Sequence, residues 1–426
     1  MFKSIIDSFI ITILVFSFMW ILSQIPLADN LEMLNPIENV LDDFDMTDIV
    51  YSQLREQPTT DTNIVVVNIG NLPRVGMADL INNLNRAQPK VIAIDAFSRR
   101  PLDPVGDSLY SAALSQVKNL VMVNQGNLSQ KTRKKLEADP NFKVEHFDTL
   151  ETSHEMFSRY AIQGHANLIS ESRGNMRDFV TIRTFSPLVK VNKQKIEAFA
   201  VKVAQIVDPK AAQDFLNRAN EYEYINYRGN IDIADKGKPV FWALDWEQAI
   251  DSSADLSWLK DKILILGFMG ETLSEYSYVD KFYTPLNKNY VGKSTLDMYG
   301  VVIHANIVSM ILNKEFINQM SWWRNYLLTI AIAFLSTWLF SYFFHKVGYW
   351  YDAITIFFQL AIFILILGIG LYAFDWYRLR VETNTAIIAV VLSGIFVELY
   401  YGLIKKLFIT IKRKNVKIKQ TNNETV

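Results

Sequence analysis

The sequence of 426 residues contains no cysteine. This absence excludes disulfide-stapled scaffolds, thiol nucleophiles and cysteine-ligated metals, and it is compatible with an oxidising compartment, in which a free thiol would be vulnerable. The chain also lacks an excess of charge of either sign, because its formal net charge is −1. Binding to nucleic acid normally requires a clear basic excess, so we expect no nucleic-acid partner.

Motifs for catalysis and metal binding are scarce as well. The five histidines include no metal-binding pair at helical spacing and no H-E-x-x-H, and no G-x-S-x-G nucleophile elbow occurs. Gly292-Lys293-Ser294 is similar to the end of a phosphate-binding loop, but Asn287 replaces the first glycine of that motif and no strand leads into it. We therefore expect no enzyme activity, no catalytic residue, no metal and no cofactor.

Long apolar runs are what the sequence has instead. The first is Ile5–Ile25, and three more follow late in the chain, at Tyr326–Phe344, Ala353–Phe374 and Ala386–Ile404. Each is long enough to cross a bilayer as a helix. For the first run a cleaved signal peptide is the alternative, although no A-x-A-like cleavage site follows it. The sequence thus predicts four transmembrane helices.

The distribution of basic residues predicts the orientation of these helices. If there are four spans, one side of the membrane receives Lys3, Lys346, Lys405, Lys406, Lys412, Arg413, Lys414, Lys417 and Lys419. By the positive-inside rule this side is the cytoplasm. We expect a multi-pass protein of a bacterial inner membrane with both termini in the cytoplasm and its large domain in the periplasm.

The expected organisation follows from the spans. Residues 1–25 are a transmembrane anchor, residues 26–325 an extracytoplasmic domain, residues 326–404 three transmembrane helices and residues 405–426 a basic cytoplasmic tail. The tail either fixes the topology or binds the anionic headgroups of the lipid bilayer.

Strand-like and helix-like segments alternate in the large domain. The β-branched run Ile64–Ile69, the amphipathic stretch Met77–Arg86 and the apolar Val91–Ile94 together predict a β-α-β unit, which normally builds a parallel sheet. The alternation continues with predicted helices at 109–117, 196–207, 243–249 and 301–312, and predicted strands at 120–123, 223–227 and 262–266. The predicted fold class is α/β with a mostly parallel sheet, plus the four transmembrane α-helices.

Three further segments have a less regular pattern. Residues 165–169 and 180–187 are interpreted as additional strands of a smaller antiparallel part. Residues 126–146 are rich in charge without a clear period, which indicates an exposed excursion from the core.

Seven segments of the sequence belong together as one pattern. In chain order they are LDDFDMTDIVYSQL (41–54), PKVIAIDAF (89–97), GHANLISESRGNMR (164–177), NYRG (226–229), LKDKILILG (259–267), TPL (284–286) and GVVIHANIVSMIL (300–312). Together they resemble the CHASE type-2 domain, a sensory extracellular module associated with cyclases and histidine kinases. The resemblance covers nearly the whole chain, and three transmembrane helices after the domain are the family's usual arrangement. It departs at Asn68-Ile69-Gly70-Asn71, where relatives often have an acidic pair and a Trp-Pro-Trp element.

The resemblance implies a sensor or adaptor that binds a ligand or protein outside the cell. Relatives usually continue into an output enzyme, whereas Lys405–Val426 is too short to fold as one. We therefore expect signalling through a separate membrane or cytoplasmic protein. The alternative is a structural subunit of a cell-envelope complex that senses no ligand. A second copy of the chain is a further candidate partner.

Five residues of the outer domain are candidates for ligand binding. Asp95 ends an apolar strand, where open α/β sheets place functional groups, although capping of the next turn is the alternative. Gly267 and Gly270 flank a turn after a strand, and this turn either offers N–H groups to an anion or has no ligand. His165, at an expected strand start, and His304, on an apolar helix, are either ligand contacts or hydrogen-bonded packing residues.

Glu398 lies within the fourth predicted span. A carboxylate there is costly unless it is protonated, hydrated or paired. It is a candidate for contact with a partner helix or with another span, for example at Gln359. The alternative is that its side chain extends toward the headgroups.

Overall fold

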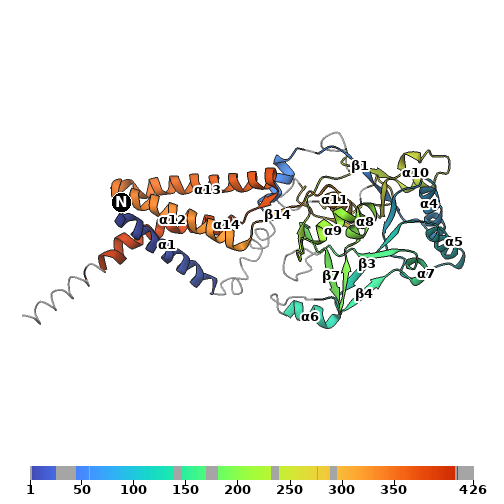
Figure 1. Cartoon of the computed structure of the whole chain (residues 1–426), viewed down its shortest axis with the longest axis horizontal. Coiled ribbons are helices and arrows are strands. Elements are labelled where there is room, and N and C mark those ends of the chain that lie inside the picture. Colours follow the sequence, from blue (N-terminus) through green and yellow to red (C-terminus); the bar gives the residue numbers. More distant parts are fainter. Residues whose placement is uncertain are drawn as a thin grey trace, which may run out of the picture. The chain divides into compact units, whose positions relative to one another are not determined.

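The computed structural model describes residues 2–24, 45–56, 58–138, 146–168, 181–231, 239–275, 277–287, 295–407 and 410. The chain divides into two compact units. The α/β unit comprises Asp48–Ile317, and the helical unit comprises Met1–Thr47 with Asn318–Val426 (Figure 1).

A seven-stranded sheet forms the centre of the α/β unit. Its strands are β1 (Asp61–Asn68), β2 (Val91–Asp95), β3 (Leu120–Asn127), β4 (Thr149–Thr152), β5 (Ile162–His165), β10 (Phe241–Leu244) and β11 (Ile263–Gly267). Their order is β10-β1-β11-β2-β3-β4, with β5 also paired to β3. Every pairing is parallel except that of β3 with β4. The predicted α/β class with a mostly parallel sheet is confirmed.

Helices cover both faces of this sheet (Figure 1). On one face lie α4 (Arg74–Arg86), α5 (Pro104–Ser115) and α10 (Trp246–Ile250), and on the other lie α8 (Phe199–Val207), α9 (Pro209–Leu216) and α11 (Gly300–Asn313). Strands buried on both faces are apolar throughout rather than alternating, as the run from Ile64 to Val67 illustrates.

One core cluster shows how the sequence pattern produces the layers. Val65 and Val67 of β1 point to the same face because side chains alternate along a strand, and they pack with Leu80 and Leu84 of α4, which lie four residues apart on one helical stripe. Each of these side chains is fully buried, which stabilises the fold by about 1.5–3 kcal/mol per side chain. α11 differs, because all its residues from Gly300 to Ile311 are buried.

Short elements complete the α/β unit. Three antiparallel ribbons pair β6 (Thr184–Phe185) with β9 (Glu223–Tyr224), β7 (Leu188–Val191) with β8 (Gln194–Glu197), and β12 (Lys281–Phe282) with β13 (Met298–Tyr299). The short helical segments are α3 (Thr47–Ile49), η3 (Val50–Leu54), α6 (Gln130–Ala138), α7 (Glu155–Ser158) and η4 (Ser257–Leu259).

Two predicted helices begin later than expected, because a short strand occupies their first residues. The helix expected from residue 196 begins at Phe199, since Ile196 lies in β8. The helix expected from residue 243 begins at Trp246, since residues 243–244 end β10, which the sequence analysis missed. Strands of four residues are too short for periodicity to distinguish them from a helical turn.

Three predicted strands also differ from the structure. The strand expected at 223–227 is only Glu223–Tyr224, and it pairs with β6 outside the central sheet. The strand expected at 165–169 lies earlier, at Ile162–His165, and joins the parallel sheet rather than an antiparallel part. Within 180–187 only Thr184–Phe185 is a strand; Val180 lies outside the described residues. In the expected excursion at 126–146, α6 is a helix, and residues 139–145 are not described.

The helical unit contains α1 (Phe2–Ser23), α12 (Trp322–Lys346), α13 (Tyr351–Tyr377) and α14 (Asn384–Leu399), which continues as η6 (Tyr400–Ile404). Four helices of the described chain are long and apolar enough to cross a membrane, and they coincide with the four predicted spans. Polar side chains join these helices: Thr12 of α1 and Thr337 of α12 share a hydrogen bond of 3.0 Å, as small polar residues do between membrane helices.

Candidate functional site

The carboxyl ends of the central strands bring several polar residues together. Asn68 ends β1, Gly267 ends β11 and Asp95 ends β2, and the strand register places Gly267 opposite both Asn68 and Asp95. His165 is the last residue of β5, so the expectation that it starts a strand is wrong. This edge of a parallel sheet is where open α/β folds bind ligands.

Asp95 faces His304 of α11. The nearest carboxylate oxygen lies 3.9 Å from His304 Nε2, which is too long for a hydrogen bond. Burial lowers the pKa of His304 to about 4 and raises the pKa of Asp95 to about 7. The imidazole is therefore neutral at physiological pH, and the pair is not an ion pair. The ring also meets Phe199 edge-on, with centroids 5.2 Å apart.

His304 and His165 are both buried imidazoles without regular partners. His304 is 4% exposed and His165 is 1% exposed. Nδ1 of His304 and both ring nitrogens of His165 make no hydrogen bond of normal geometry within the described chain. Burial and the neighbouring His304 lower the pKa of His165 to about 3, although the backbone of Ser186 opposes this shift in part. The expectation that both histidines are hydrogen-bonded packing residues receives no support from these contacts.

Asp280 is a fourth member of this group, and the sequence analysis did not identify it. It precedes β12 in a left-handed conformation, with φ of 58°. Crowding by neighbouring atoms and the charge of Asp95 raise the pKa of Asp280 to about 7. Asp280 also has an exposed surface, so contact with solvent opposes the increase in its pKa. We name Asp95, Asp280, His165 and His304 the acid–imidazole cluster.

Gly267 and Gly270 have structural reasons to be glycine. A Cβ atom at Gly267 would lie 2.7 Å from Cβ of Val301, so the absence of a side chain lets α11 approach the sheet. Gly270 has φ of +103°, which other residues rarely adopt. Their role in ligand binding stays a prediction.

Asn68 ties the turn between these glycines to β1. Its side-chain oxygen accepts hydrogen bonds from the amides of Met269 (2.8 Å) and Gly70 (3.1 Å). Its side-chain nitrogen donates to Asp245 (3.0 Å) and to the carbonyl of Gly270 (3.2 Å). The departure from the family pattern at this position therefore has a structural role here, and the amide of Met269 is already used inside the protein.

A metal site is not indicated by the described side chains. Within the described ranges no group of three or more histidine, aspartate or glutamate side chains has a geometry that could hold a metal ion. The acid–imidazole cluster instead presents two carboxyl groups and two neutral imidazoles at one sheet edge. These groups can accept hydrogen bonds and attract positive charge.

The segments that carry the family resemblance hold one another in place. Asn306 of α11 is fully buried, and its side-chain oxygen accepts the amides of Arg228 (2.7 Å) and Gly229 (3.1 Å). Its side-chain nitrogen donates to the carbonyls of Gly229 (3.0 Å) and Val302 (2.9 Å). The NYRG segment is thereby bound to α11. Sequence reasoning did not single out Asn306, although its position in a fully apolar helix was a detectable sign.

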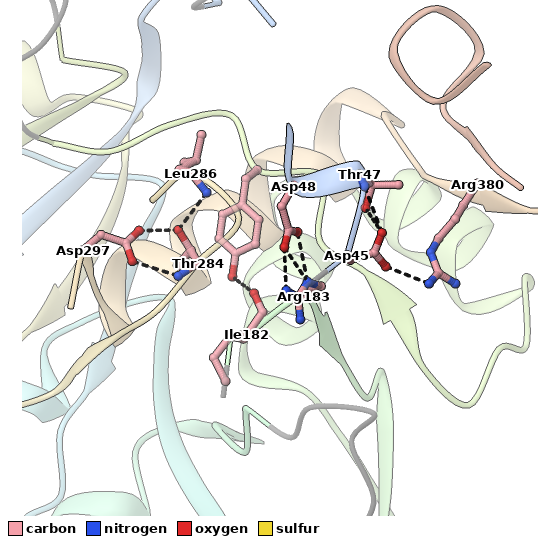
Figure 2. Close-up of polar contacts among 10 residues, drawn as sticks. Asp45, Thr47, Asp48, Ile182, Arg183, Thr284, Leu286, Asp297 and Arg380 are labelled. Carbon is pink, nitrogen blue, oxygen red and sulfur yellow. Dashed lines mark hydrogen bonds and ion pairs between the residues drawn. The ribbon is translucent and has the colours of Figure 1, made fainter. Parts of the chain in front are cut away.

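Figure 2 shows further polar contacts from the same segments. Asp48 forms an ion pair with Arg183 at 2.5 Å, and both side chains are largely buried. The amide of Thr284 donates to Asp297 (2.8 Å), and its hydroxyl bonds to the same carboxyl group. Burial raises the pKa of Asp297 to about 6.

Two segments of the helical unit, one before and one after the α/β unit in the chain, bind to the loop between α13 and α14. The segment that precedes the α/β unit contains Asp45, which accepts a hydrogen bond of 2.8 Å from Arg380 (Figure 2). The segment that follows it contains β14 (Asn318–Gln319), which pairs in parallel with β15 (Leu379–Arg380). The loop between α13 and α14 therefore holds both connections.

Glu398 and Gln359 are not partners. Glu398 is exposed on α14, whereas Gln359 donates to the backbone carbonyls of Val390 (3.4 Å) and Val391 (3.0 Å). The expected contact between the two side chains is therefore wrong. The role of Glu398 in binding a partner stays a prediction.

Asp7 of α1, unlike Glu398, is buried within the helical unit. It accepts hydrogen bonds from the hydroxyls of Tyr400 (2.9 Å) and Tyr401 (3.1 Å), and its oxygen lies 2.5 Å from Nζ of Lys405. Sequence reasoning missed Asp7, because it treated the first span as continuously apolar. An acidic residue near the start of the first span and a lysine at the end of the fourth could have suggested this pairing.

Comparison with known protein families identifies the family of this chain. The CHASE2 domain family matches residues 14–341, which is more than half of the chain. No curated protein and no solved structure shows significant similarity to the chain. CHASE2 is a family of extracellular sensory domains. The chain therefore belongs to the CHASE2 domain family and carries its sensory module.

Proposed function

We propose that the protein is a membrane-anchored extracytoplasmic sensor or adaptor, which binds a ligand outside and signals through a separate partner protein. One observation carries this proposal: the loop between α13 and α14 holds the chain both before and after the α/β unit, through Arg380–Asp45 and β14–β15. A change of state in a domain can alter membrane helices only through contacts that differ between two states. The loop joins α13 to α14, so a change in the Arg380–Asp45 or β14–β15 contacts would act directly on these two helices.

The partner is proposed to bind at the helices. α14 presents Glu398 on an exposed face, where an unpaired carboxylate within a membrane is costly. A partner helix with a donor side chain would remove that cost. The proposed partner is a membrane or cytoplasmic signalling protein.

Affinity purification from solubilised membranes tests the partner. Glu398→Leu should leave expression intact and reduce recovery of the co-purifying protein at least severalfold, whereas Val391→Leu, also exposed on α14, should leave recovery unchanged. Equal recovery with both variants would remove Glu398 from the proposed contact. Recovery of envelope-assembly proteins without any signalling protein would instead support a structural subunit.

The proposed location is a bacterial inner membrane with both termini in the cytoplasm and the α/β unit in the periplasm. The support is the asymmetry of basic residues around four helices that could span. Reporter fusions after residues 150 and 415 should read outside and inside, respectively. A cytoplasmic reading after residue 150 would contradict this topology.

A further inference from the structure

We propose that Asp95, Asp280 and His304 form a binding site for a small organic cation with N–H donors, such as a primary ammonium group. This inference rests on the proposed sensor function and names the class of ligand that the sensory module recognises.

The first support is that Asp95 lacks the compensation that other buried carboxylates receive. Elsewhere in the α/β unit three buried carboxylates have an arginine, in the pairs Asp48–Arg183, Asp107–Arg74 and Glu223–Arg218. Asp61 and Asp297 instead accept hydrogen bonds from Ser309 and Thr284. Within the described chain, the 3.9 Å approach of His304 is the one polar contact of the Asp95 side chain. Burying a carboxylate without a partner is costly, and that cost favours binding of a cation.

The second support is independent of the carboxylates. His304 is 4% exposed and directs Nε2 at Asp95, and its Nδ1 has no hydrogen-bond partner within the described residues. His165, 1% exposed, also lacks a regular partner. Buried polar side chains normally have partners, so these ring nitrogens without a regular hydrogen bond support a ligand that completes the site.

His304 of α11 lies 3.9 Å from Asp95, and Asp280, before β12, is close enough to Asp95 for the two charges to interact. His165 of β5 is a neighbour of His304, and Lys281 follows Asp280 in the chain. The ammonium group of Lys281 lies over the ring of Tyr299, 4.6 Å from its centroid. Among the described residues, no basic side chain is a cause of the raised pKa of Asp95 or of Asp280. A cationic ligand would supply a positive charge to these two carboxyl groups.

The surroundings favour an organic cation over a metal ion. The described part of the chain offers no group of three ligating side chains for a metal. Aromatic rings lie near the cluster: Phe199 meets His304, and the ring of Phe282 would be 3.1 Å from a Cβ atom at Gly300. Such rings suit the carbon atoms of an organic ligand and attract cations. Asp280 is exposed, which gives a ligand access from solvent.

Binding should be linked to the release of a proton. Burial holds the pKa of Asp95 at about 7, so near neutral pH the empty site carries a proton for part of the time. A bound ammonium favours the ionised carboxylate and displaces that proton. For one proton with this pKa, the apparent affinity should increase about tenfold between about pH 6 and about pH 8.

Thermal unfolding of the full chain in lipid nanodiscs tests this site with methylammonium as the probe. A ligand that binds only the folded state raises the melting temperature. Methylammonium should stabilise the protein with an apparent affinity about tenfold higher at about pH 8 than at about pH 6. Tetramethylammonium, which has no N–H donor, and sodium at the same ionic strength should have little effect.

Variants make the test specific to the cluster. Asp95→Asn should weaken the effect of methylammonium at least about tenfold, because the asparagine carries no negative charge. If that variant folds poorly, Asp280→Asn at an exposed position should show the same loss. Asp297→Asn, which removes another carboxyl group of raised pKa outside the cluster, should respond as the unchanged protein does.

Three results would overturn the inference. They are an equal effect of tetramethylammonium, an unchanged effect of methylammonium in Asp95→Asn and Asp280→Asn, and stabilisation by zinc or calcium ions but not by methylammonium. A failure to bind methylammonium leaves the partner recovery experiment unaffected, so the failure of this inference is distinguishable from failure of the proposed function.

Discussion

Replacing Asn306 with alanine should release the NYRG segment from α11. The fully buried side chain of Asn306 accepts hydrogen bonds from the amides of Arg228 and Gly229 and donates to the carbonyl of Gly229. Alanine would leave two N–H groups and one carbonyl without these partners. Each buried polar group that loses its partner costs about 1–3 kcal/mol.

The expected loss of stability is about 3 kcal/mol, the low end of that sum, because water entering the vacated space would satisfy some of these groups. A loss of this size increases the equilibrium constant for opening roughly a hundredfold, since about 1.4 kcal/mol corresponds to a factor of ten. Hydrogen exchange of the full chain, followed in peptides that cover residues 226–231, measures that opening directly.

Asn313→Ala is the matched control. Asn313 lies on the same helix, is exposed, and donates only to Ser309 within the described chain. Its replacement should change stability by no more than about 0.5 kcal/mol. An acceleration of less than tenfold in Asn306→Ala, or equal exchange in both variants, would refute the view that Asn306 binds the two segments together.

Three further predictions concern the α/β unit. Arg183→Met should destabilise it by about 3–5 kcal/mol in chemical unfolding because it leaves Asp48 buried without its cation, and an unchanged midpoint would contradict a buried ion pair. Gly267→Val should destabilise it by about 1–3 kcal/mol because of the clash with Val301, and a stable variant would show that α11 can shift away. Because the pKa of Asp95 is raised in the folded state, the stability it contributes is complete below about pH 4 and is lost as the pH rises through about 7, by at most about 4 kcal/mol. Asp95→Asn should flatten this decline in the melting temperature, and an equally steep decline would assign it to other groups.

The parts of the fold that sequence predicted are those with long, uniform patterns. The buried run at Ile64–Val67 and the four apolar helices depend on composition over many residues, so local physics determines them. β10 and β5 are four residues each, and their place in the sheet depends on partners far away in the chain. The order of the sheet, with β11 between β1 and β2, follows from the same distant contacts.

The candidate site was predicted in part for a similar reason. Asp95 could be found because a charged residue at the end of an apolar strand is conspicuous, and His304 because it interrupts an apolar helix. Their proximity could not be found, because more than two hundred residues separate them. Asp280 has no local pattern at all: its relevance comes from crowding by neighbouring atoms and from the charge of Asp95, which together raise its pKa.

The membrane helices illustrate the limit most clearly. Both Asp7 and Glu398 are single carboxylates in apolar helices, and sequence alone does not tell which of them faces a neighbouring helix. The structure pairs Asp7 with Tyr400, Tyr401 and Lys405, and it leaves Glu398 exposed. Rotation of either helix about its axis by less than one turn would change whether its carboxylate is buried or exposed. The packing of the helices determines that rotation.

Asp45 and Asp48 lie on either side of the boundary between the two units. Asp45 binds Arg380 in the helical unit, and Asp48, three residues later, binds Arg183 in the α/β unit. The covalent link between the two ion pairs is therefore only three residues long. Because Arg380 also belongs to β15, which pairs with β14, a displacement of Asp45 would act on the same loop as a displacement of the chain that leaves α11. In the proposed sensor, the chain from the end of α11 to β14 would give a ligand at His304 a covalent route to the loop between α13 and α14.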